Sequence, residues 1–122
     1  MIRKTFKKSE RLSAKTLIKE LFDKGSSFYL YPFKVLFLPT TQSTTQLLIS
    51  VPKKNHKTAV ARNQLKRRIR EAYRLNKEYL PTEKNFLIAY IYTSRDINKY
   101  SEIEKSIIAI NQRIKNNTDE KA

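Results

Sequence analysis

The segment at residues 52–77 contains ten basic residues and one acidic residue, so only a small part of its surface can pack against a core. At about 100° per residue, residues 59–75 form a helix with a single narrow apolar sector. The side chains in that sector are Leu65, Ile69, Ala72 and Tyr73. The sequence therefore predicts a surface helix that packs through this sector and leaves the rest of its circumference uncovered.

A stripe of basic side chains runs along the predicted helix beside its apolar sector. Arg62, Lys66 and Arg70 repeat every four residues, and Arg67 and Arg74 lie next to them. Like-charged neighbours at this spacing destabilise an isolated helix, and a solvated face normally mixes both signs. Because the planar fork of arginine matches phosphate geometry, the stripe predicts phosphate binding. A merely solvated face is the alternative interpretation.

The composition of the whole chain points to a polyanionic partner. It contains 26 Lys and Arg against 11 Asp and Glu, a formal net charge of +15, and nucleic acid is the commonest partner of such proteins. The absence of cysteine excludes disulfides, thiolate catalysis and Cys-ligated metal sites. No apolar run is long enough for a membrane span or a signal peptide. We therefore expect a cytoplasmic protein that binds no membrane.

The remaining apolar patterns predict one α+β domain with a small open sheet. Its ordered core covers about residues 10–115, between polar tails at 1–9 and 116–122. We expect a first helix from an N-cap at Ser13 to about residue 24, ended by Gly25. Strands within 27–38, a hairpin loop at 40–46 and a returning strand at 47–51 should follow. After the basic helix we expect a buried strand at 85–92 and a last helix that begins with a capping box of Ser101 and Glu104.

No set of residues suits catalysis by the protein itself. The single histidine, His56, lies in a Lys-rich loop, where we expect it to be exposed or to face RNA, with a structural role as the alternative. Glu71 is best interpreted as the partner of an Arg on its own helix. Tyr90 and Tyr92 are predicted to be core residues, although a strand bearing two tyrosines can also stack unpaired bases. One glycine cannot form a Gly-rich phosphate loop, and the acids lack metal-site spacing.

Residues 61–74, ARNQLKRRIREAYR, resemble the signature of the bacterial ribonuclease P protein family. That signature is an Arg-Asn pair, a Lys-Arg pair two residues later, and an Arg-Glu pair two residues after that. The matching positions are Arg62, Asn63, Lys66, Arg67, Arg70 and Glu71. Gln64 departs from the pattern, since the family has a second Arg there, and residues 55–58 lack the glycine usual in this loop. The likeness extends over about residues 10–115.

The resemblance implies a two-layer α/β sandwich in which a left-handed crossover joins the signature helix to the sheet. It implies membership of an endoribonuclease that removes the 5′ leader of precursor tRNA. In such a complex the RNA subunit binds Mg²⁺ and carries catalysis, so we expect no cofactor and no metal on the protein.

The resemblance also assigns candidate contacts with the two RNA partners. Those expected to bind the catalytic RNA, including Arg74 from the adjoining stripe, are Arg62, Asn63, Lys66, Arg67, Arg70 and Arg74. Those expected to bind the precursor tRNA leader are Phe22, Ile18, Lys53, Lys54, Lys57 and Arg95. Phe22 and Ile18 occupy positions where the family often has two phenylalanines one turn apart.

Composition alone fits a second function equally well, that of a basic ribosomal protein or ribosome-assembly factor. A DNA-binding module is not expected, because the chain has no helix-turn-helix pattern, zinc ligands or heptads. A membrane-surface protein is disfavoured, because the apolar sector of the basic helix is needed for the core.

Overall fold

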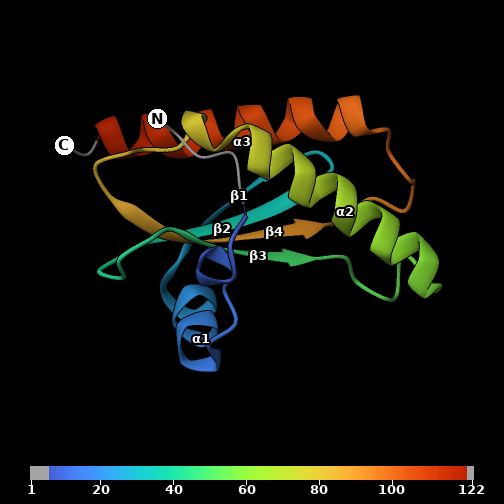
Figure 1. The fold of residues 1–122 in the computed structure, drawn as a ribbon, viewed down its shortest axis with the longest axis horizontal. Coiled ribbons are helices and arrows are strands. Elements are labelled where there is room, and N and C mark those ends of the chain that lie inside the picture. The colour runs from blue at the N-terminus through green and yellow to red at the C-terminus, as the bar shows by residue number, and fades with distance from the viewer. Residues whose placement is uncertain (1–5, 121–122) are drawn as a thin grey trace.

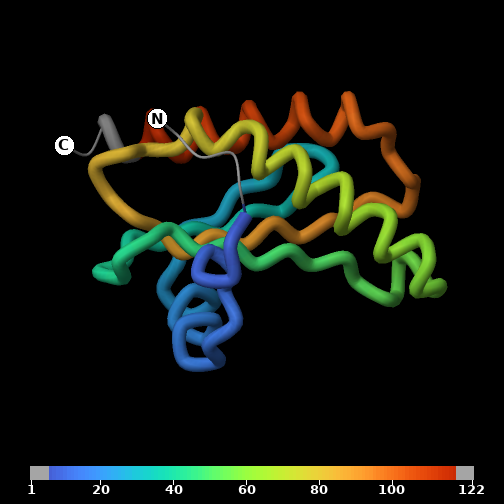
Figure 2. The backbone as a smooth tube through the Cα atoms, viewed as in Figure 1, coloured from blue at the N-terminus to red at the C-terminus, as the bar shows by residue number. Residues whose placement is uncertain are grey.

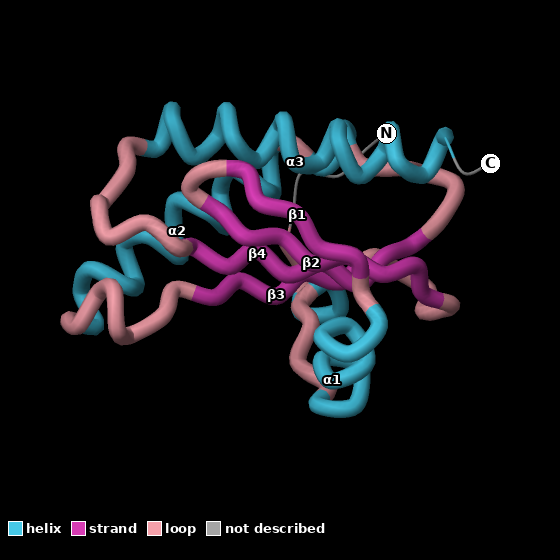
Figure 3. The backbone as a smooth tube through the Cα atoms, turned by 180° about the vertical axis from the view of Figure 1, so that it is seen from behind, coloured by secondary structure: helices cyan, strands magenta, loops and turns pink. Residues whose placement is uncertain are grey.

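The computed structural model describes residues 6–120, in which helices cover both faces of a four-stranded sheet (Figure 1). In chain order the elements are the 3₁₀ helix η1 (Lys8–Glu10), α1 (Lys15–Lys24), β1 (Ser26–Leu30), β2 (Phe33–Thr40), β3 (Gln46–Ser50), α2 (Ala59–Leu75), the 3₁₀ helix η2 (Lys77–Tyr79), β4 (Asn85–Tyr92) and α3 (Tyr100–Glu120). Helices α2 and α3 form one layer, and α1 lies on the opposite face (Figures 1 and 3). The predicted α+β class is confirmed.

The basic helix lies where its apolar sector predicted. Helix α2 has the expected bounds, and its buried residues are the four of that sector. Thr58 is the N-cap of the helix, and its hydroxyl oxygen accepts a hydrogen bond from the Ala61 backbone N–H at 3.2 Å. Burial of one sector therefore fixes which side of α2 faces away from the core.

Strand β2 is buried on both faces. Phe33, Val35 and Phe37 lie in the core formed with α2 and α3, as their alternation predicted. Leu36, between them in sequence, is also buried, because it packs with Leu21 of α1 on the other face. Tyr90 and Tyr92 are fully buried, so their prediction as core residues is confirmed and the base-stacking alternative is wrong.

The predicted hairpin at residues 40–46 is wrong. The strand order is β1-β2-β4-β3, and β3 pairs in parallel with β4 rather than with β2. Strand β4 is almost continuously buried and takes the central place beside β2, whereas β3 has one fully buried residue and lies at the edge. Helix α2 joins the parallel neighbours β3 and β4. Seen from the α2 side with these strands pointing up, β4 lies to the left of β3, so the crossover is left-handed (Figure 1).

The first and last α-helices, α1 and α3, begin differently from the sequence prediction. Helix α1 starts after Ala14 with no side-chain cap, so Ser13 is not its N-cap. Helix α3 starts at Tyr100, which places Ser101 inside the first turn and excludes the capping box. Glu104 instead accepts hydrogen bonds from the Asn76 amide at 3.0 Å and the Tyr100 hydroxyl at 3.1 Å. The contact with Asn76, 28 positions away, could not be predicted from the local motif.

The described parts of the two predicted tails contain regular structure. Helix α3 continues through residues 116–120, and η1 precedes α1. Residues 1–5 and 121–122 of those tails lie outside the described part of the chain. Among the described helices, none has both the length and the apolar character needed to cross a membrane.

Gly25 ends α1, as predicted, but its backbone is extended (φ −69°, ψ 151°) rather than left-handed. A Cβ at this position would overlap the Leu21 carbonyl oxygen and lie 3.0 Å from Leu21 Cδ1. Close approach of the helix end, not backbone conformation, therefore requires glycine here.

We expect Gly25→Ala to lower the free energy of unfolding by about 1–3 kcal/mol, the usual effect of overpacking. Urea denaturation followed by circular dichroism measures this loss. Ser26→Ala, at the exposed next residue, should change stability by less than about 0.5 kcal/mol. Equal midpoints for the two variants would show that the end of α1 adjusts freely.

Candidate nucleic-acid interface

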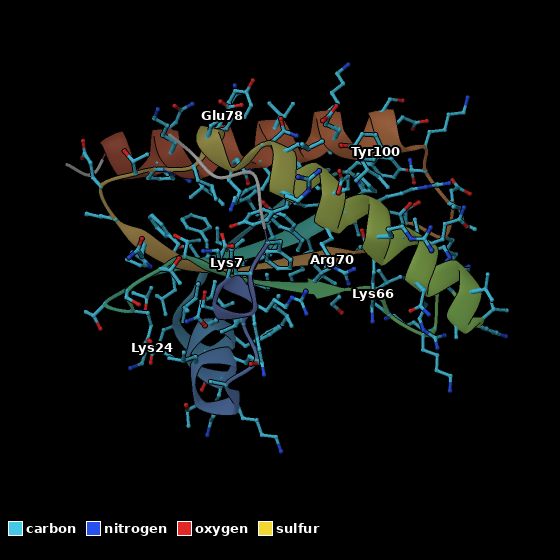
Figure 4. All side chains as sticks on the ribbon, viewed as in Figure 1. Lys7, Lys24, Lys66, Arg70, Glu78 and Tyr100 are labelled. Atoms are coloured by element: carbon cyan, nitrogen blue, oxygen red, sulfur yellow. The ribbon has the colours of Figure 1, made fainter. Side chains whose placement is uncertain are left out.

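The basic side of α2 faces away from the core and toward the edge strand β3. Lys66 and Arg70 project from α2 on this side (Figure 4) and help to line a groove with β3 residues. Asn63 and Arg67 are exposed on the same helix. The structure therefore brings the predicted stripe together as one cationic surface.

Two arginines of residues 52–77 also hold loops in place. The half-buried Arg62 donates from Nη1 to the carbonyl oxygens of His56 and Lys57, both at 2.9 Å. Arg68 donates from Nη1 to the Asn98 carbonyl oxygen at 2.7 Å. Arg62 thus fixes the β3–α2 loop to the start of α2, a role that the charge pattern did not indicate.

Arg74 is engaged within its own helix. It forms an ion pair with Glu71, and its Nε donates to Glu71 Oε2 at 3.1 Å. This hydrogen bond from Arg74 lowers the pKa of the Glu71 carboxyl. The interpretation of Glu71 is confirmed, and the charge of Arg74 is largely compensated at the far end of the stripe.

The expectation that His56 is exposed or faces RNA is wrong, and its structural alternative is correct. His56 is 5% exposed, and its Nε2 lies 2.8 Å from the Ser94 carbonyl oxygen. Its ring packs against Tyr92 with centroids 5.7 Å apart. Asn55 donates from Nδ2 to the Thr93 carbonyl oxygen at 3.3 Å. These contacts tie the loop at residues 52–58 to the loop that follows β4.

Joining the two loops gathers four of the predicted leader residues at one end of the sheet. Lys53, Lys54 and Lys57 are exposed on the first loop, and Arg95 is exposed on the second. The other two predicted leader residues lie on α1, beneath the middle of the sheet (Figure 1). There Phe22 is 48% exposed, whereas Ile18 is half-buried against the core on this face.

A row of residues across all four strands lies between α1 and the end of the sheet where these two loops meet. Paired positions place Tyr29, Lys34, Ile91 and Ser50 side by side. Ile91 packs with the core on the α1 face, so the whole row belongs to that face. Tyr29 is 58% exposed and Lys34 is exposed. The row is an open strip of sheet that offers an aromatic ring and a cation.

Sequence reasoning missed Tyr29 and Lys34 as site residues. The alternation of Lys34 with Phe33 and Val35 did signal an outward side chain. It carried no information about which part of the sheet α1 leaves uncovered.

Among residues 6–120, no three His, Asp or Glu side chains lie close enough together to hold a metal ion.

Comparison with known proteins gives consistent matches over most of the chain. The family model for ribonuclease P matches residues 6–115. The ribonuclease P protein component of Porphyromonas gingivalis is 34% identical over 108 residues, which cover 82% of this chain and 79% of the relative. That of Petrotoga mobilis is 32% identical over 116 residues, covering 90% and 95%. The solved ribonuclease P protein of Thermotoga maritima matches with a TM-score of 0.75 and 29% identity, covering 86% of this chain and 97% of that one.

Proposed function

The chain belongs to the ribonuclease P protein family, and on that premise we propose that it binds the catalytic RNA through α2 and the 5′ leader of precursor tRNA through the open sheet strip beside α1. The family assignment makes it a protein component of an endoribonuclease complex that processes tRNA, with RNA as partner. It favours this role over that of a ribosomal or assembly protein.

The orientation of α2 is the observation that carries the catalytic-RNA contact. Because the apolar sector is buried, Asn63, Lys66, Arg67 and Arg70 must face outward. Cations one helical turn apart suit successive phosphates of an RNA backbone. Arg62 can contribute while it holds the loop, whereas Arg74 is the weakest member of the proposed set because Glu71 compensates its charge.

The proposed leader site combines the α1 residues Phe22 and Ile18, the open strip, and the loop cations Lys53, Lys54, Lys57 and Arg95. Unpaired RNA is bound by aromatic rings that stack on bases and by cations that follow its backbone. Tyr29 and Lys34 supply both groups in the middle of this surface. A single strand lying along it would run past α1 toward the joined loops.

We further propose that the RNA subunit holds the catalytic Mg²⁺. The protein's contribution would be to lower the repulsion between two polyanions and to grip the leader.

Cleavage of a precursor tRNA by a bacterial ribonuclease P RNA at low Mg²⁺, with and without this protein, tests the proposed function. Strong stimulation that yields the mature 5′ end is expected. Tight RNA binding without stimulation of a cognate RNA would favour a ribosomal or assembly role instead.

Phe22→Ala is expected to weaken precursor tRNA binding by the assembled complex about tenfold, the effect of one lost stacking contact. Assembly with the catalytic RNA should stay unchanged, because α1, which carries Phe22, lies on the sheet face opposite α2 (Figure 1). Filter binding of each RNA measures the two steps separately. Thr16→Ala, exposed on the same helix, is the matched control. If Phe22→Ala mainly unfolds the protein, Phe22 is a core residue and its leader role is wrong.

A further inference from the structure

A groove lies between the N-terminal segment (residues 6–12), the outer edge of β3 and α2, with a cavity volume of about 200 Å³. We propose that this groove binds one unpaired nucleotide of the catalytic RNA, with its base between the N-terminal segment and the β3 edge and its phosphate beside Lys66 and Arg70. This inference rests on the proposed function and adds a second kind of contact to it, beyond the α2 stripe.

The floor of the groove is a strand edge. Leu47, Leu48 and Ile49 all line it, although alternate side chains of a strand point to opposite faces. The backbone edge is therefore what the three residues share. The Leu47 carbonyl oxygen points outward, since it accepts a hydrogen bond from the Leu12 N–H at 2.9 Å. Ile49, two residues further along β3, directs its backbone N–H and C=O to the same outer side as the Leu47 carbonyl. This donor and acceptor pair matches the hydrogen-bonding edge of a base.

The N-terminal wall is fixed at several points. It crosses the β3 edge from the α2 side of the sheet to the α1 side (Figure 2). The Phe6 ring packs edge-on against Tyr73, with centroids 5.6 Å apart. Glu10 forms an ion pair with Lys77 at 2.7 Å, and each of these side chains is only 14% exposed. The wall is thus part of the folded structure, although composition predicted a polar tail over most of it.

The charges around the groove select a polyanion. Three cations line it, Arg11, Lys66 and Arg70, and none of its described lining residues is acidic. The nearby carboxylate of Glu10 is already paired with Lys77. The volume is below the roughly 300–1,000 Å³ that encloses a drug-sized ligand, which suits a single base.

The remaining lining groups suit a planar base. The Arg11 guanidinium lies 5.4 Å from the centre of the Phe6 ring, so a planar cation and an aromatic ring stand together at the groove. Both are groups on which unpaired bases stack. An RNA strand on the α2 stripe reaches this groove directly, because Lys66 and Arg70 belong to both surfaces.

The test uses the full chain, a bacterial ribonuclease P RNA transcript and the variant Arg11→Ala. We expect its affinity for the RNA to fall about tenfold, the effect of losing one stacked base. Lys8→Ala removes a cation of the same segment that does not line the groove, and should change affinity less than about twofold. Arg11→Gln keeps most of the side-chain stem and should reproduce the loss if the variant with alanine proves unstable.

A double variant tests whether Arg11 and Arg70 contact the same nucleotide. The combined loss in Arg11→Ala/Arg70→Ala should be smaller than the product of the two single losses. If Arg11→Ala and Arg11→Gln bind like the wild type while Lys66→Ala is weakened, the groove proposal is overturned and the α2 assignment stands. If the wild-type protein itself does not bind this RNA, the proposed function fails first.

Discussion

Arg62→Ala should impair both binding steps of the complex, whereas Lys66→Ala should impair only one. Each change removes one cation from the α2 stripe. Arg62, however, also donates hydrogen bonds to the carbonyl oxygens of His56 and Lys57, so its loss removes two of the contacts that position the loop carrying Lys53 and Lys54. We expect Arg62→Ala to weaken catalytic-RNA binding about tenfold through the lost phosphate contact, and to weaken leader binding through the two lost hydrogen bonds that position the loop.

Salt titrations distinguish the loss of a phosphate contact from the loss of loop positioning. Lys66→Ala should reduce the slope of log K against log salt for the catalytic RNA by about one, with leader binding unchanged. Arg62→Ala should reduce that slope by at least as much and also weaken precursor tRNA binding to the assembled complex. Arg62→Lys retains the charge without the planar fork, and should restore the slope but not leader binding. Identical behaviour of Arg62→Ala and Lys66→Ala in both assays would show that the loop holds its position without Arg62.

Tyr90→Ala is expected to lower the free energy of unfolding by about 4 kcal/mol, a large part of the roughly 5–15 kcal/mol of a typical domain. Tyr90 is 0% exposed, and its ring lies 5.9 Å from Phe33 and 6.0 Å from Tyr73 between centroids. Its hydroxyl donates to Asn111 Oδ1, and burial raises the pKa of Tyr90 well above its ordinary value. The hydroxyl therefore stays protonated as a donor.

Tyr90→Phe separates the hydroxyl from the ring. It should cost only about 1–3 kcal/mol, because it leaves the buried Asn111 oxygen without its donor. Urea unfolding followed by circular dichroism measures both variants. Tyr29→Ala is the matched contrast: at 58% exposure it should keep its stability and weaken leader binding. A Tyr90→Ala protein as stable as the wild type would show that the core repacks around the missing ring.

What could be predicted from sequence was set by neighbours close along the chain. Apolar residues three and four apart fixed the bounds of α2, its buried sector and hence its outward basic stripe. The same periodicity argument placed Glu71 within reach of an Arg on its own helix. The alternation in β2 and the apolar run of β4 likewise identified these strands as core.

The tertiary structure alone decided which distant segments meet. Strand periodicity says which face a residue lies on but not which strand it pairs with, so the insertion of β4 between β2 and β3 was not visible in the chain. His56 was predicted to be exposed or to face RNA, because the sequence does not show that the Ser94 carbonyl, 38 positions away, is its buried partner. The strip of Tyr29 and Lys34 and the groove beside β3 exist for the same reason. Both are surfaces that remain uncovered once the helices have packed. The helix and strand propensities of nearby residues do not indicate which part of the sheet a distant helix leaves uncovered.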